Sequence, residues 1–171
     1  VYHASLGNTQ AVLLNGTQAT SATGAWNNTS PTSTLITLGS TSAVNTNAAT
    51  FVAFCFAEIA GFSKFGSYTG NGSTDGVFVY TGFRPKYVMY KCSSSTGDWD
   101  IYDSSRDPYN QNTHVLYADS SVAESTSGYA PVDFLSNGFK IRNTGSDFNT
   151  NGATYIYAAF AENPFKYANA R

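Results

Sequence analysis

Short apolar or alternating runs, separated by clusters of Gly, Asn, Asp and Ser, dominate this chain. Such runs predict β-strands joined by tight turns. We expect strands at residues 50–57, 64–68, 77–81, 86–91, 98–102, 114–118, 138–142 and 154–161. The pattern predicts an all-β fold, an antiparallel β-sandwich of jelly-roll or lectin-like type.

Two of the expected strands differ from the others in their pattern. Residues 50–57 and 154–161 are apolar on both faces, which is typical of a central strand covered on both sides. Residues 98–102 alternate instead. There we expect Trp99 and Ile101 to face the core, and Asp100 and Tyr102 to face solvent.

The same two strands lie in two stretches of similar sequence, which form an internal echo within the chain. Residues 45–58 and 149–162 are identical at 8 of their 14 positions, and the surrounding chain matches at nearly the same spacing. A fixed period is the mark of a repeat, here of about 100 residues. We therefore expect residues 1–60 to be the C-terminal part of a first unit and residues 61–171 to be a complete second unit. The two would pack as one composite β domain in which the two echoed strands are central, and Val1 would lie inside a strand of the first unit.

Charge narrows the classes of partner. The chain has 9 basic and 11 acidic residues, so it lacks the basic stripe that nucleic-acid binding requires. No apolar run approaches the ~20 residues of a membrane helix, and we expect no membrane insertion. Solubility must come from Ser, Thr, Asn and Gly, a composition common on extracellular and virion proteins.

The residues that carry chemistry form no catalytic pattern. His3 and His114 are replaced by other residues at the matching repeat positions, and no nucleophile motif is present. With two scattered Cys and two His, no zinc-ligand spacing exists, and we expect no metal and no cofactor. Cys55 is expected to be a buried free thiol, although pairing with Cys92 stays open. We predict a protein without catalytic residues.

Acidic residues gather in one part of the chain. Asp98, Asp100, Asp103 and Asp107 could in principle bind calcium, but two of them lie on an expected strand, so an exposed strand face is the favoured interpretation.

The loop at residues 104–112 is the main difference between the two units. It is longer than its counterpart and carries Arg106, Asp107, Tyr109 and Asn110. Loops on a rigid sandwich often carry recognition, and Tyr among polar groups suits sugar or protein contacts. We predict these four residues as a ligand-binding site; the alternative is an ordinary long connection between strands.

Several runs together resemble a known family. Residues 62–80, 81–90, 99–103, 133–140 and 154–163 are similar to a domain repeated near the C-termini of bacteriophage tail and tail-fibre proteins, especially of marine phages and metagenomes. The resemblance implies an adhesin: a virion appendage, extracellular, that recognises a host cell-surface glycan or protein through exposed loops. It also implies a homo-oligomer, with a trimer as one option. The alternatives are a polysaccharide depolymerase of a phage tail and a purely structural spacer.

Overall fold

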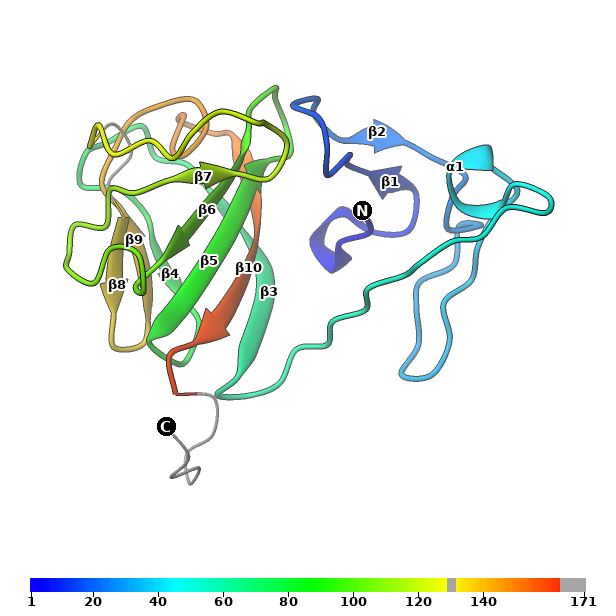
Figure 1. Ribbon diagram of the computed structural model, residues 1–171, viewed down its shortest axis with the longest axis horizontal. Coiled ribbons are helices and arrows are strands. Elements are labelled where there is room, and N and C mark those ends of the chain that lie inside the picture. The colour runs from blue at the N-terminus through cyan, green and yellow to red at the C-terminus, as the bar shows by residue number, and fades with distance from the viewer. Residues whose placement is uncertain (129–131, 164–171) are drawn as a thin grey trace.

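The computed structural model describes residues 1–128 and 132–163 of the chain (Figure 1). Its elements are short and mostly β. In chain order they are η1 (Ala4–Leu6), β1 (Gln10–Ala11), β2 (Ser21–Ala22), α1 (Ser42–Asn45), β3 (Ser63–Thr69), β4 (Phe78–Tyr80), β5 (Pro85–Cys92), β6 (Trp99–Asp103), β7 (Leu116–Tyr117), β8 (Val132–Leu135), β9 (Gly138–Ile141) and β10 (Thr154–Ala161).

Within the described ranges, two antiparallel sheets face each other. One has the order β3-β10-β5-β6-β7 and the other the order β4-β9-β8. Strands β1 and β2 pair with each other in residues 1–58, the N-terminal segment. The side chains between the two sheets form the main core. The predicted antiparallel β-sandwich is therefore confirmed.

Strand β10 lies inside the larger sheet, next to the edge strand β3. It pairs antiparallel with β3 on one side and with β5 on the other (Figure 1). Its inward side chains Tyr155, Tyr157 and Ala159 are buried in the main core. The ring of Tyr157 meets that of Phe139 edge-on, with centroids 5.4 Å apart. This face of β10 is covered by the smaller sheet.

The N-terminal segment covers part of the opposite face. Val12 packs against Trp99 and Ile156 in a second buried cluster, and the indole Nε1 of Trp99 donates to the carbonyl of Leu13 at 2.7 Å. Nearby, Lys91 Nζ donates to the carbonyl of Thr17 at 2.9 Å. Both faces of β10 are thus covered, as its apolar pattern predicts.

The echo of β10 behaves differently. Residues 50–57 run as an extended segment outside any strand, so the prediction of a central strand there is wrong. Val52 and Phe54 are 77% and 83% exposed, and Cys55 is an exposed free thiol rather than a buried one. The reason is that residues 50–57 have no strand beside them to pair with in the described structure. The backbone of β10, in contrast, forms hydrogen bonds with β3 and β5.

The prediction for residues 98–102 is also wrong. Asp100 and Tyr102 are buried, whereas Ile101 is only partly buried. Trp99 faces the N-terminal segment rather than the core between the sheets. The physical reason is that both faces of β6 are covered: Tyr102 lies in the core between the two sheets, and Trp99 lies under the N-terminal segment.

Burial leaves Asp100 in an unusual state. The residue is 1% exposed, and neither carboxyl oxygen has a hydrogen-bond partner among the described residues. Burial raises the pKa of Asp100 well above its usual range. The negative charges of Asp147, Asp98 and Asp119 add to this effect, and Lys91 opposes it. Folding therefore favours the protonated form.

This predicts the effect of Asp100→Asn. The unfolded chain loses the Asp100 proton near pH 3.9, and the folded protein loses it only at higher pH. Asp100 therefore lowers the free energy of unfolding as the pH rises between the two pKa values. The amide cannot ionise. We expect the variant to gain stability relative to the wild type as the pH rises from about 4 to about 8, because only the wild type has to keep a buried carboxyl group protonated. Urea unfolding at both pH values measures this, and an equal pH dependence of the two proteins would contradict it.

A second prediction concerns the N-terminal cover. Val12→Ala removes two methyl groups from the Val12–Trp99–Ile156 cluster, and we expect a loss of roughly 1–3 kcal/mol in the free energy of unfolding. Leu14→Ala is the matched control, because Leu14 is 47% exposed and its loss should change stability by less than about 0.5 kcal/mol. If both variants melt like the wild type, the segment does not stabilise the sandwich.

Candidate functional site

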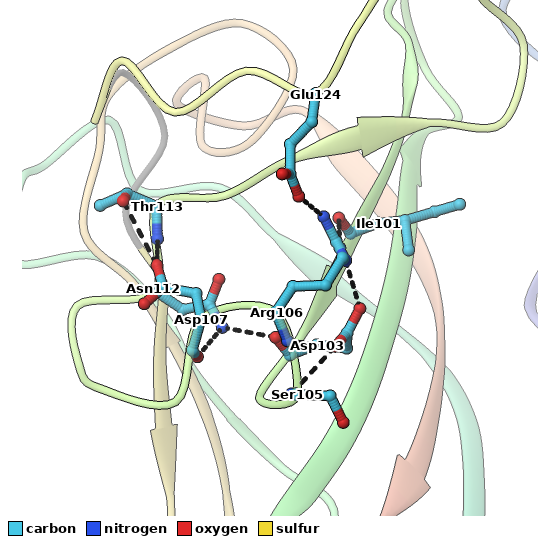
Figure 2. Close-up of polar contacts among 8 residues, drawn as sticks. All are labelled: Ile101, Asp103, Ser105, Arg106, Asp107, Asn112, Thr113 and Glu124. Carbon is cyan, nitrogen blue, oxygen red and sulfur yellow. Dashed lines mark hydrogen bonds and ion pairs between the residues drawn. The ribbon is translucent and has the colours of Figure 1, made fainter.

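The predicted binding loop begins where β6 ends. The carboxylate of Asp103 accepts hydrogen bonds from the backbone N–H groups of Ser105 and Arg106, each at 2.9 Å (Figure 2). An Asp that bonds the backbone two residues on is a local turn device. Asp103 therefore turns the chain out of the sheet and starts the loop.

Arg106 ties this turn to distant parts of the chain. Its Nε lies 2.5 Å from Asp103 Oδ2, its Nη1 pairs with the carboxylate of Glu124, and its Nη2 donates to the carbonyl of Ile101 at 3.1 Å (Figure 2). Burial works to raise the pKa of Asp103, but the hydrogen bonds and charge of Arg106 outweigh it and hold the pKa below its usual range. The guanidinium is occupied by protein groups, which leaves it poorly placed to meet a ligand.

Asp107 closes the loop on its far side. Its Oδ2 accepts from the backbone N–H of Thr113 at 2.7 Å and from the Thr113 hydroxyl at 3.3 Å (Figure 2). Between them, the buried Asn112 donates through Nδ2 to the carbonyls of Asp103 at 3.1 Å and Asp107 at 2.9 Å. These bonds hold both ends of the loop together.

Asn110 joins the loop to the smaller sheet. Its side-chain amide donates to the carbonyl of Phe134 at 3.0 Å, and its Oδ1 accepts from the Phe134 N–H at 2.9 Å. The side chain thus imitates a neighbouring strand beside β8. The same carbonyl accepts from Arg84 Nη1 at 3.0 Å, and Arg84 Nε lies 3.0 Å from Glu162 Oε2. A partly exposed Arg–Glu pair therefore lies beside the loop.

Tyr109 is a predicted residue whose side chain the loop leaves exposed. Its side chain is 80% exposed, while Arg106, Asp107 and Asn110 are engaged with other parts of the protein. Of the four predicted ligand-binding residues, three hold the loop. Two are exposed, Tyr109 and Asn110, and the Asn110 amide is engaged by its hydrogen bonds to the backbone of Phe134. The structure adds Glu124 and Arg84, which lie far along the sequence and have no local pattern that would connect them to the loop.

The sequence matches the family described as a domain of unknown function, DUF7483, over residues 1–164. The chain belongs to this family. Comparison with curated proteins and with solved structures gave no match. The match runs across the predicted boundary at residue 60, so the N-terminal segment and the sandwich both lie within the DUF7483 region.

Other candidate sites in this DUF7483 protein are weaker. Among the described residues, no three His, Cys, Asp or Glu side chains gather in a way that could hold a metal ion. A search of the same residues finds no helix suited to crossing a membrane. The N-terminal segment forms a partly open hollow of about 250 Å³ lined mainly by small and apolar side chains, including Val12, Trp26 and Val44. It offers few groups that could orient a polar ligand.

The arrangement predicts that Arg106 controls the order of the loop. Arg106→Ala removes both ion pairs and the bond to Ile101, and we expect faster cleavage within residues 104–112 by an added protease. Since the ion pairs are partly exposed, the loss of global stability should be only about 1 kcal/mol. The control is Lys64→Ala, which removes the more exposed ion pair to Glu58 and should leave cleavage in this loop unchanged. Equal cleavage of wild type and Arg106→Ala would contradict the assignment.

Proposed function

We propose that this protein is a non-catalytic binding domain that contacts a host-surface glycan through the loop at residues 104–112, with Tyr109 as the contact residue. The observation that carries the proposal is a solvent-exposed aromatic side chain on a loop fixed by its own charged residues. A rigid loop loses little conformational entropy when a ligand binds. A tyrosine offers both an apolar ring face for a sugar and a hydroxyl for a hydrogen bond.

The resemblance to phage tail and tail-fibre domains supports an extracellular role on a virion appendage. Such an appendage would carry several copies of the domain in a homo-oligomer, a trimer being one option. Several weak contacts on one fibre raise the overall avidity without any new contact. One exposed tyrosine per domain is therefore enough for useful attachment.

The depolymerase alternative gains no support from the acidic cluster. A glycosidase needs two carboxyl groups that reach the same sugar. Asp100 is buried in the core, and Asp103 is occupied by Arg106 and by backbone N–H groups. The spacer alternative differs from the proposal in a measurable way, since a spacer binds no glycan.

The test is binding of the purified domain to an array of bacterial surface polysaccharides and to cells. We expect Tyr109→Ala to weaken binding at least about tenfold, the equivalent of 1.4 kcal/mol and within the range of an aromatic contact. Phe54→Ala is the matched control, because Phe54 is exposed to a similar degree but lies in the separate segment at residues 50–57. Wild-type binding by Tyr109→Ala would reject the site. An intact oligomer that binds no glycan and no cell would reject adhesion and favour the spacer.

A further inference from the structure

Residues 1–58 expose an unusual amount of apolar surface. Leu35, Phe51, Val52, Phe54 and Phe56 are between 47% and 83% exposed. Large exposed apolar patches are rare on proteins in water and usually mark a surface that another molecule or segment covers. The question is what covers them.

The sequence echo relates these residues to the core of the sandwich. At a spacing of 104 residues (45 to 149), Leu35 matches Phe139 and Phe51 matches Tyr155, and both matching residues are 0% exposed. By the same spacing, the exposed Cys55 matches Ala159, which is also 0% exposed. Leu35, Phe51 and Cys55 therefore stand at positions that the sandwich buries, while Phe54 and Phe56 match positions that it buries in part.

The turns that precede residues 50–57 and β10 have the same backbone hydrogen bonds. Asn45 N–H donates to the Thr41 carbonyl at 2.9 Å, and Asn149 N–H donates to the Gly145 carbonyl at 2.8 Å. The next turns match as well: Ala49 donates to Thr46 and Ala153 donates to Thr150, each at 3.1 Å.

The backbone echo extends beyond these turns. Ala48 has a positive φ of 61°, and Gly152 at the matching position has 78°. For a residue with a Cβ this conformation is uncommon, so its recurrence is informative. Further upstream, the pairing of Ala11 with Ser21 matches the bridge between Val115 and Ser125. Residues 1–58 thus reproduce local structure of the sandwich without forming its sheet.

The partners of β10 show which contacts residues 45–58 lack. Asn149, fully buried, bonds through its side chain to Asn71 and Ser73, which follow β3. The backbone of β10 pairs with β3 and β5, and Glu162 pairs with Arg84 at the start of β5. Asn45 and Glu58, the matching residues, have none of these partners; Asn45 bonds to Gly39, and Glu58 pairs with Lys64.

We propose that residues 1–58 are the back half of a second sandwich, and that strands of the β3, β4 and β5 type from another copy of the unit complete it. Residues 50–57 then become a central strand between the two added neighbours. Glu58 exchanges Lys64 for an arginine at the position of Arg84, so the charges are complementary, and the Asn45 side chain meets a turn like the one at residues 71–73. The proposal does not depend on glycan binding.

The test supplies the missing strands covalently. Residues 61–100, which contain β3, β4 and β5, are joined directly ahead of Val1 of the full chain, because Val1 and Tyr2 match Ile101 and Tyr102. The readout is the rate at which the Cys55 thiol reacts with a maleimide, followed on its own peptide by mass spectrometry. We expect fast labelling in the unextended chain. In the extended chain labelling should be on the order of 100-fold slower, because a buried thiol reacts only after local opening.

Three further variants of the extended chain sharpen the result. Ala53 stands where the sandwich has Tyr157, so Ala53→Tyr fills the space that the smaller residue would leave. Asn45→Ala should restore fast labelling, whereas Asn47→Ala should not, because Asn149 is buried and Asn151 is exposed. An extension of the same composition in scrambled order should leave Cys55 reactive.

Slow labelling that depends on the ordered extension and on Asn45 supports the proposal. Fast labelling of Cys55 in the extended chain, both with Ala53 and with Ala53→Tyr, would overturn it. Slow labelling already in the unextended chain would overturn it as well. In that case residues 50–57 would pair with the free edge of β3 in their own chain, continuing the bridge between Ile59 and Ser63.

Discussion

A strand that is apolar on both faces must be covered on both sides, and the architecture of this protein follows from that requirement. Strand β10 meets it with the smaller sheet on one face and the N-terminal segment on the other. Its backbone is satisfied by β3 and β5. The similar composition at residues 50–57 has no paired strand on either side. It contacts the sandwich at Phe56, whose ring lies 5.8 Å from that of Phe160, and it remains an extended, largely exposed segment. Strand formation here is decided by the surroundings and not by the residues alone.

The loop at residues 104–112 depends on the same sheet. Because β6 lies within it, Asp103 at the end of β6 has a fixed position from which to organise the loop. Arg106 and Asn110 then connect the loop to Glu124 and to β8. Charged and amide groups that sequence alone marks as ligand contacts are used instead to make the loop rigid. Tyr109 gains a defined position from this arrangement.

The predictable part of this structure is the part with local causes. Alternating runs and turn residues located β3, β4, β5, β6, β9 and β10, and the fold class follows from them. Three features could not be predicted because they depend on contacts between distant residues. These are the burial of Asp100, the roles of Arg106 and Asn110, and the exposure of residues 50–57. In each case the deciding partners are remote in sequence. They are the core between the two sheets for Asp100, Glu124 and Phe134 for the loop residues, and the strands that flank β10 for residues 50–57.

Hydrogen exchange of the intact chain tests most directly the claim that coverage decides strand formation. The account predicts that the backbone amides of Tyr155 to Phe160 are among the slowest to exchange, because β10 is hydrogen-bonded to a strand on each side and lies in a covered sheet. The amides of residues 51–57 should exchange at the rate of an unstructured peptide. Comparable protection of the two segments would contradict the account, because it would mean that the echo forms a strand without the neighbours that β10 requires.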